Sequence, residues 1–522
     1  PGSALSSGGP FRGFETFTPG QGACQPLNLF GVGAPSQAAI DFITTDLRRE
    51  RTIEQTVISG FLSGDSSSFL TLPGGPIAIV VGAEFRLEES IFVADALESP
   101  RPDSLPESSR SALAVRSLTF PADGPVASVD GEFNVWELYG EASVPLLNNM
   151  PYAETLRLDG AYRYSDYDNL GGQNTWNVGL VYEPIVGLTL RGSFSQTVRA
   201  PNINELFSPL TAATARPVDV CTQDAITDPN SNRAINCAAD GLPTDFADPN
   251  TARVSGFQGG NPDLEAEKAD TFTAGFVLTP TALPNFVLTV DYYDITIDDG
   301  IDDVGLAQVL TACYDSDPAT FADNPFCTRF ERDRDSTSAT FLGLSNFTLV
   351  EENFASIETS GFDFTAQYQF ALGDLTARLA PYGDLLLRVV GNKVEELERF
   401  EDPVDSSIVN DLLFENGQPE WAINTDIRWA VGALTVNLQS RYLGEFLEMT
   451  PRLEIETVDT FDNAWTGEIW RHDLSATYDI KEGVRVYGGI NNLAGVDPIK
   501  SETAYPFGAL GRSFFFGTNV RF

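Results

Sequence analysis

The chain has 522 residues, of which 74 are acidic and 32 are basic, and its formal net charge at pH 7 is −42. This charge argues against nucleic acid as a partner, because nucleic-acid binding needs a basic surface. The longest wholly apolar runs, such as Ile77–Val81, are far shorter than the roughly 20 residues of a membrane helix. Any membrane crossing must therefore be made by strands. We interpret the acidic excess as charge on loops and lumen that keeps an exported protein soluble, with attraction of cations as the alternative.

Apolar and polar side chains alternate along most of the chain, with the two-residue period of β-strands. In 187–199, Leu190 and Phe194 share one face, and Arg191 lies on the other. We predict about fifteen strands. In chain order they lie near 52–70, 76–93, 130–145, 153–167, 173–183, 187–199, 268–279, 285–298, 344–371, 375–397, 419–431, 433–448, 464–480, 484–494 and 510–522.

The last strand ends in a terminal aromatic residue, Phe522, and has one apolar and one polar face. This pattern is typical of the closing strand of a bacterial outer-membrane β-barrel. We therefore predict an all-β fold, a transmembrane antiparallel β-barrel. Phe522 is interpreted as a C-terminal signal for the barrel assembly machinery, and outer-membrane lipid would surround the barrel.

Short turns are predicted near 148–151, 183–186, 280–284, 372–374 and 481–483. Long polar segments lie between other strands, near 94–129, 200–267, 299–343 and 398–418. Barrels of this class have short turns at the periplasmic rim and long loops outside, and bacterial single-chain barrels have even strand counts. Because fifteen is odd, we predict a truncated barrel at 52–522, with residues 1–51 forming part of an extracellular loop.

Four of the five cysteines fall in pairs within the long polar segments. Cys221 and Cys237 share one segment, and Cys313 and Cys327 share another. Short loops of this kind suit disulfides formed in an oxidising compartment, so we predict one bridge in each. Cys24 is left over. Metal binding is disfavoured, because the chain has a single histidine and no CxxC pattern.

The segment from Val198 to Phe207, V-R-A-P-N-I-N-E-L-F, resembles a characteristic box of TonB-dependent outer-membrane receptors. The companion box is similar to G-N-P-D-L-E-A-E-K at Gly260–Lys268, and later family patterns resemble Ser360–Asp363 and Asn491–Leu493. The box positions carried over are Val198, Arg199, Ala200, Pro201, Asn202, Glu205, Leu206, Phe207, Gly260, Asn261, Pro262 and Leu264. Cys24–Gly31 further resembles a subfamily common in alphaproteobacteria, in which a second cysteine often lies just upstream.

The resemblance implies a complete protein with 22 strands, a plug inside the lumen and a short TonB box. It also implies an outer-membrane location in a Gram-negative bacterium and active import of a scarce nutrient, energised by the TonB–ExbB–ExbD system. The plug and TonB box are not visible in this sequence. Polar residues predicted to face the lumen and grip the plug are Arg191, Asp291, Gln367 and Arg428. The chain has no GxSxG, P-loop or HExxH motif, so we predict that it is not an enzyme and needs no cofactor.

The two boxes have a structural interpretation, because they bracket the longest loop, and proline ends or begins strands at Pro201 and Pro262. The loop at 200–267 is still the best candidate to contact substrate, since loops on a rigid scaffold carry specificity. Aromatic residues near strand ends predict interfacial girdles, with sugar-binding platforms as the alternative. They are Tyr162, Tyr164, Tyr167, Trp429, Tyr442, Trp465, Trp470 and Tyr478.

Several ligands stay open. Haem is disfavoured, because no histidine lies between the boxes and His472 falls in a predicted strand. The aspartates at 294–303 favour a solvated strand exit before a short helix near 304–313, with Ca²⁺ as the alternative. Ferric siderophores, oligosaccharides and cobalamin-like complexes are candidate cargoes. The negative charge disfavours an anionic siderophore unless Arg216, Arg233 and Arg253 converge. An unplugged passive channel and a surface-binding protein that does not transport are the alternative functions.

Overall fold

The computed structural model describes most of the chain. The described residues are 4–5, 15–16, 25, 27–28, 30–31, 35–44, 46, 48–95, 128–208, 210–223, 232–250, 253–400, 409–415, 417–447, 465–497 and 510–521. Cys24 and Phe522 lie outside them, as does most of the predicted loop at 94–129.

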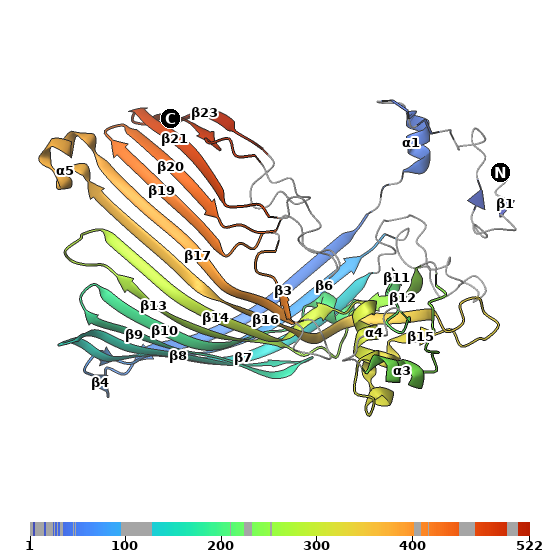
Figure 1. Cartoon of the computed structure of the whole chain (residues 1–522). Helices are drawn as coiled ribbons and strands as arrows, with labels where there is room; N and C mark the ends of the chain where they lie inside the picture. Colours follow the sequence, from blue (N-terminus) through green and yellow to red (C-terminus); the bar gives the residue numbers. More distant parts are fainter. Residues whose placement is uncertain are drawn as a thin grey trace.

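Within these residues, fifteen long strands form one ladder in which each strand runs antiparallel to the next (Figure 1). In ladder order they are β3 (Glu50–Asp65), β6 (Ala78–Val93), β7 (Val129–Met150), β8 (Ala153–Tyr167), β9 (Gly171–Ile185), β10 (Leu188–Arg199), β13 (Glu267–Leu278), β14 (Phe286–Asp303), β16 (Leu344–Ala371), β17 (Asp384–Phe400), β19 (Trp421–Val431), β20 (Leu434–Leu443), β21 (Ile469–Lys481), β22 (Val484–Asn491) and β23 (Ser513–Val520). The ladder curves into a barrel wall.

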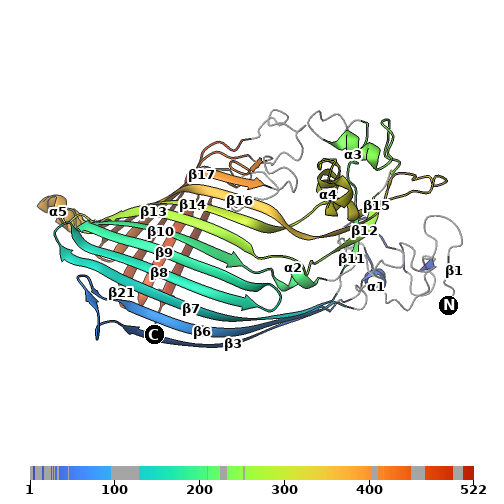
Figure 2. The same ribbon diagram turned by 90° about the horizontal axis from the view of Figure 1, so that it is seen from below.

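The two rims of this wall differ. One carries short turns and the small elements β4 (Thr71–Leu72), β5 (Gly75–Pro76), α5 (Leu372–Leu375) and η4 (Ala377–Tyr382). Most of the remaining small elements lie toward the opposite rim, as Figures 1 and 2 show. They are α2 (Ile203–Phe207), β11 (Thr211–Ala215), α3 (Arg233–Ala239), β12 (Val254–Gly259), α4 (Leu306–Tyr314), η2 (Phe321–Asp323), η3 (Pro325–Thr328), β15 (Phe330–Arg332) and β18 (Val409–Asp411).

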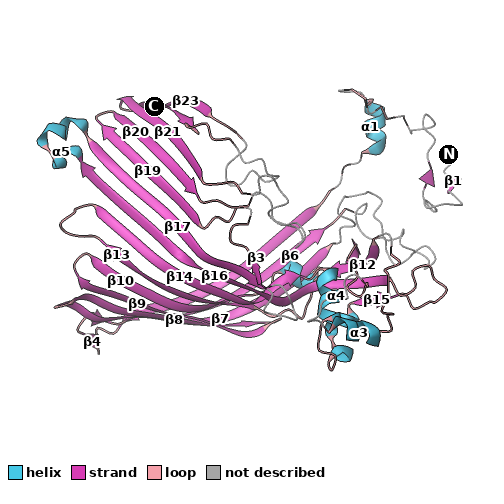
Figure 3. Ribbon diagram, in the orientation of Figure 1, coloured by secondary structure: helices cyan, strands magenta, loops and turns pink. Residues whose placement is uncertain are grey.

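Strands dominate the described residues, and the helices are short (Figure 3). The segment before β3 holds β1 (Ala4–Leu5), β2 (Glu15–Thr16) and α1 (Gln37–Ile43), whose first turn is capped by the Ser36 side chain. None of the helices in the described part of the chain is long and apolar enough to cross a membrane.

One strand boundary predicted from the sequence is wrong. The strand expected at 375–397 begins only at Asp384, and the expected short turn at 372–374 is a longer helical connection, α5 followed by η4. Pro381 lies in this connection and has no amide hydrogen for a ladder. Gly383 then reverses the chain with a φ of +79°, a conformation that favours glycine. The apolar residues there resemble a strand in sequence, but proline and glycine place them in the turn.

The two faces of the wall differ in chemistry. Trp136 and Leu138 of β7 are exposed on one face, whereas Glu137 between them is only 5% exposed on the other. Ring pairs join neighbouring strands on the apolar face, as between Trp176 and Phe194, whose centroids are 5.3 Å apart. An apolar outer face and a polar inner face are the pattern of a membrane barrel. The aromatic girdles themselves stay a prediction.

The larger hydrophobic core of the described residues lies beyond the wall, at the long-loop rim. We call this region the rim lobe and define it as 210–223, 232–250, 253–259 and 304–343. Its core includes Leu310 and Tyr314, and Phe347 at the start of β16 packs into the same core; each is 1% exposed or less. A membrane barrel has lipid outside and polar groups inside, so its wall does not build such a core. The rim lobe lies beyond the wall and has a buried core of its own.

Candidate functional site

The two family boxes meet at the long-loop rim. Val198 and Arg199 end β10, where they pair with Lys268 and Glu267 at the start of β13. The Arg199 guanidinium donates to both oxygens of Glu267, one at 2.7 Å, and to the Glu205 carboxylate at 3.1 Å. One arginine thus joins α2 to two neighbouring strands.

Helix α2 begins with a capping box. The Asn202 side chain accepts hydrogen bonds from the amides of Asn204 and Glu205 at 2.9 and 3.1 Å, and Glu205 accepts from the Asn202 amide at 2.7 Å. This satisfies amides that a helix start leaves without partners. Ile203 and Phe207 lie over Gly131 of β7, where an added Cβ would approach each of them to 2.7 Å. The helix is therefore seated on the wall.

The second box closes over the first. The Asn261 amide donates to the Glu205 carbonyl at 2.7 Å, and the Gly260 amide donates to the Ser208 carbonyl at 2.8 Å. A Cβ on Gly260 would lie 2.7 Å from the Glu205 carbonyl oxygen, so only glycine fits there. Among the other box residues, Pro201, Leu206 and Leu264 are buried, Ala200 is half-buried, and Pro262 lines a recess. In this geometry the boxes anchor the loop between them.

The inner face of the wall carries polar contacts below the boxes. Arg163 of β8 pairs with Glu137 of β7, and it lies 3.5 Å from Glu84 of β6. The Ser165 hydroxyl also donates to Glu137, at 2.5 Å. These residues line a recess of about 420 Å³. The recess shares Gln173 with a second one of about 420 Å³, which is bounded by the second box. The two recesses therefore adjoin near the long-loop rim.

Of the four residues predicted to grip a plug, the structure brings two together. Arg191 of β10 donates to both carboxylate oxygens of Asp291 of β14, at 2.7 and 2.5 Å. Gln367 and Arg428 lie in β16 and β19. Contact with a plug stays a prediction.

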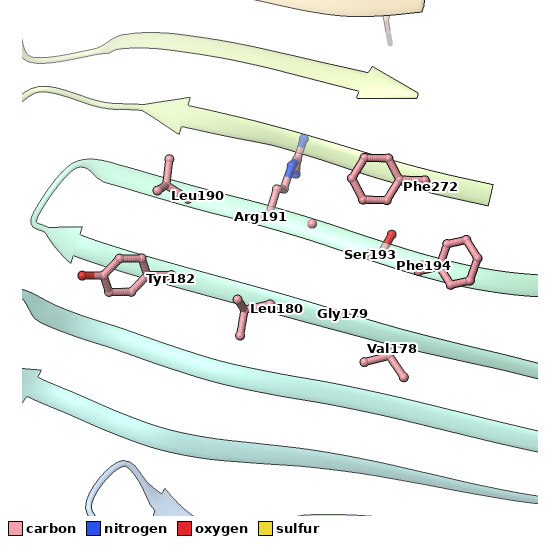
Figure 4. A pocket seen from close by; sticks show the side chains of 10 residues that line it. Val178, Gly179, Leu180, Tyr182, Leu190, Arg191, Ser193, Phe194 and Phe272 are labelled. Carbon is pink, nitrogen blue, oxygen red and sulfur yellow. The ribbon is translucent and has the colours of Figure 1, made fainter. Parts of the chain in front are cut away.

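The opposite face of the same strands is apolar. Figure 4 shows Val178, Leu180 and Tyr182 of β9 beside Leu190 and Phe194 of β10. Gly192 lies between the last two in sequence and supplies no side chain, which leaves a shallow recess of about 440 Å³. This surface suits lipid chains rather than a polar cargo.

Two disulfides brace the rim lobe. Cys221 is bonded to Cys237, and Cys313 is bonded to Cys327, with Cα–Cα distances of 5.8 and 4.9 Å. These are the two bridges predicted from the spacing of the cysteines. The first ties a loop to α3, which holds Cys237, and the second ties α4, which holds Cys313, to η3, which holds Cys327.

Sequence reasoning missed the buried ion pair at the centre of the rim lobe. Arg332 donates to both carboxylate oxygens of Asp219, at 2.6 and 3.0 Å, and to the Tyr314 hydroxyl at 2.8 Å. The two charged side chains are 1% and 0% exposed. Phe246, Tyr314 and Phe330 surround the guanidinium, each ring centre within 5.8 Å. Nothing in the sequence marks these partners, because 113 positions separate the two charges.

The electrostatics of this cluster follow from its burial. Burial alone would lower the pKa of Arg332, but the hydrogen bonds and charge of Asp219 outweigh it and raise the pKa. Burial raises the pKa of Tyr314 despite the nearby charge of Arg332, and the hydrogen bond to Asp240 adds to the increase. Arg332 is therefore permanently charged, and Tyr314 stays protonated as a hydrogen-bond donor to Asp240 at 2.7 Å.

The calcium alternative finds no support in the described residues. The aspartates at 294–303 lie on β14 or at its end, where Asp302 pairs with Arg399 and Asp299 lies 3.5 Å from Lys268. Among the described residues, one cluster of three carboxylate side chains is close enough together to hold a metal ion. It lies elsewhere, at Glu358, Glu396 and Glu398. His472 lies in β21, where its Nδ1 shares a hydrogen bond with the Ser440 hydroxyl at 2.8 Å.

Comparison with known proteins decides the family. The family model "TonB dependent receptor-like, beta-barrel" matches residues 18–493. The chain belongs to this family. The resemblance seen in the two boxes and the predicted fold class are both confirmed. Family members and the solved neighbours are transport receptors rather than enzymes.

Solved TonB-dependent receptors share the fold of this family member at low sequence identity. The siderophore receptor PirA from Acinetobacter baumannii is 14% identical, with a TM-score of 0.55 over 90% of this chain and 55% of that receptor. A variant of the ferric enterobactin receptor PfeA from Pseudomonas aeruginosa, in complex with enterobactin, is 13% identical, with a TM-score of 0.55 over 90% and 54%. The chain thus spans about half the length of these receptors. No curated protein matches its sequence significantly.

Proposed function

We propose that this chain is the barrel of an outer-membrane receptor in a Gram-negative bacterium, which imports a scarce nutrient. The observation that carries the proposal is the family match over 18–493. The apolar outer face of the wall fits outer-membrane lipid, and the polar inner face fits a lumen. Energy for import would come from the TonB–ExbB–ExbD system acting on a plug. Insertion would need the barrel assembly machinery.

In this proposal the rim lobe faces the cell exterior. Long loops of outer-membrane barrels lie outside, and the two disulfides fit an oxidising environment. Residues 52–522 are assigned to the barrel, and residues 1–51 to an extracellular segment before it. The two polar recesses beside the boxes would then lie at the outer end of the lumen, where a cargo would enter.

The candidate nutrients are ferric chelates and oligosaccharides. The solved neighbours are named for siderophores, but at 13–14% identity they support the fold alone. Passive conduction and surface binding without transport are the competing functions. Passive conduction predicts uptake of the cargo that is independent of TonB, whereas surface binding without transport predicts no uptake through this chain.

Two measurements test the proposal. Growth of the native strain on limiting iron or on single oligosaccharides is compared with that of a strain lacking this gene and one lacking TonB. We expect the two deletions to lose growth on the same nutrient. Growth that survives loss of TonB would contradict import. Steady open currents from the native protein in planar bilayers would instead indicate a passive channel.

A further inference from the structure

The arginines of the rim lobe divide into two groups. Four of them are in ion pairs with carboxylates: Arg233 with Asp315, Arg329 with Glu352, Arg332 with Asp219, and Arg334 with Asp240. Arg216 and Arg253 have no carboxylate partner among the described residues. Within the described part of the chain, the one side-chain hydrogen bond of Arg253 is long, 3.4 Å to the Thr214 hydroxyl. In a chain with a net charge of −42, two such arginines in one lobe need an explanation.

These two arginines are neighbours. Strands β11 and β12 pair antiparallel, and the last pair of the ladder joins Ala215 to Val254. Arg216 follows Ala215, and Arg253 precedes Val254, so the two residues lie at the same end of the β11–β12 ladder, on opposite strands. Both are exposed. An anionic cargo was expected to need Arg216, Arg233 and Arg253 close together. Arg216 and Arg253 lie at one end of the same ladder, whereas Arg233 is bound to Asp315.

The two paired strands that carry them, β11 and β12, are held firmly. Their other face packs on the core of the rim lobe, where Val254 is 7% exposed. β12 also pairs in parallel with β16, from Phe257 opposite Thr348 to Gly259 opposite Val350. The Cys221–Cys237 disulfide follows β11 closely. A rigid support lets side chains bind without a large ordering cost.

The exposed face of the β11–β12 strand pair has the chemistry of an anion site. Two like charges side by side repel each other, and a bound anion would relieve that repulsion. Guanidinium groups match carboxylate and phosphate oxygens with paired, charge-assisted hydrogen bonds. Thr214 and Ser255 present hydroxyls on the same face, and Phe257, which is 39% exposed, adds a flat apolar surface.

We propose that Arg216 and Arg253 form an anion-recognition site that selects ligands carrying carboxylate groups. This inference rests on the proposed import function. It narrows the cargo, among ferric chelates and oligosaccharides, to those that are acidic. Two kinds of cargo carry such carboxylate groups: acidic oligosaccharides and ferric chelates of hydroxycarboxylic acids. Because the overall field of the chain repels anions, the local pair has to provide the attraction.

The test uses the native receptor in outer membranes, without energisation. Binding of trigalacturonate, ferric citrate and the neutral maltotriose is measured for the wild type, for Arg216→Gln/Arg253→Gln and for Arg216→Lys/Arg253→Lys. Arg334→Gln is the matched control. It removes one positive charge from the same lobe, as each glutamine substitution at the site does, but at an arginine that is already paired with Asp240. Resistance of the barrel to heat denaturation in detergent checks that each variant is folded.

We expect one acidic probe to bind the wild type more tightly than maltotriose. The double glutamine variant should then weaken binding by about tenfold or more, the lysine variant should weaken it less, and Arg334→Gln should change it by less than about twofold. The identity of the bound probe separates the two kinds of cargo. Equal binding by the double glutamine variant, or no preference for either acidic probe, would overturn the site. Uptake in a TonB deletion strain reports on import separately.

Discussion

Arg191 of β10 reaches across β13 to Asp291 of β14, with nitrogen–oxygen distances of 2.7 and 2.5 Å. The residue between them in the ladder is Gly275, which pairs with both. The ion pair exists because the middle strand has no side chain at that point. An ordinary cross-strand contact joins neighbours, whereas this one spans two ladder steps and ties three strands on the inner face.

The first prediction concerns Gly275. A Cβ there would lie 2.2 Å from the Asp291 carboxylate and 2.4 Å from the Val290 carbonyl, so Gly275→Ala should displace the ion pair. Overpacking of this kind costs about 1–3 kcal/mol. Urea unfolding of the barrel in detergent measures the loss. Gly60→Ala in β3 is the control, because a Cβ there meets nothing within 4 Å. Equal stability of the two variants would show that the inner wall adapts freely.

The second prediction concerns the buried pair of Asp219 and Arg332. Asp219→Asn removes the carboxylate that accepts two hydrogen bonds from Arg332 and leaves this guanidinium, which is 1% exposed, with only the Asp240 carboxylate at 3.4 Å. Removing one partner of a buried ion pair costs about 3–5 kcal/mol, so the rim lobe should open at lower urea concentration, as followed by limited proteolysis. Arg334→Gln breaks an exposed pair in the same lobe and should cost less than about 1 kcal/mol. If both variants open at the same urea concentration, the buried pair is not what holds the lobe.

The third prediction is a dependence on pH. The pKa of Tyr314 is raised in the folded lobe, whereas in the unfolded chain tyrosine titrates near pH 10. The stabilisation is therefore complete below about pH 10 and is lost as the pH rises above it, by up to about 1.4 kcal/mol per pH unit. Urea midpoints of the rim lobe at pH 8 and pH 11 should reveal the slope. Tyr314→Phe should reduce the slope, while Tyr382→Phe at the opposite rim should retain it.

The fourth prediction concerns the disulfides. Alkylation of the native protein without reductant should leave Cys221, Cys237, Cys313 and Cys327 unmodified. After reduction, the rim lobe should lose about 2–4 kcal/mol per bridge, because each bridge restricts the unfolded chain. Mass spectrometry after digestion reads the labelling, and proteolysis in urea reads the stability. Labelling of all four cysteines before reduction would refute the bridges.

Local pattern determined most of the wall. The period-two alternation that predicts strands at 153–167 and 344–371 comes from the geometry of a strand, which turns successive side chains to opposite faces. Both strands have those bounds in the structure. The prediction failed at 375–383, where the residues are apolar enough for a strand but Pro381 and Gly383 require a turn. Composition alone does not resolve that conflict, because backbone geometry outweighs hydrophobicity there.

The strands, the family boxes and the cysteine pairs could be predicted from the amino-acid sequence, since each depends on residues close together in the chain. Tertiary packing sets which distant groups meet. It placed Arg332 on Asp219, closed Asn261 over Glu205, and brought Arg216 and Arg253 to the same end of the β11–β12 ladder. The physical reason is that burial and charge pairing in the rim lobe depend on how segments far apart in sequence pack, and no periodicity along the chain encodes that contact.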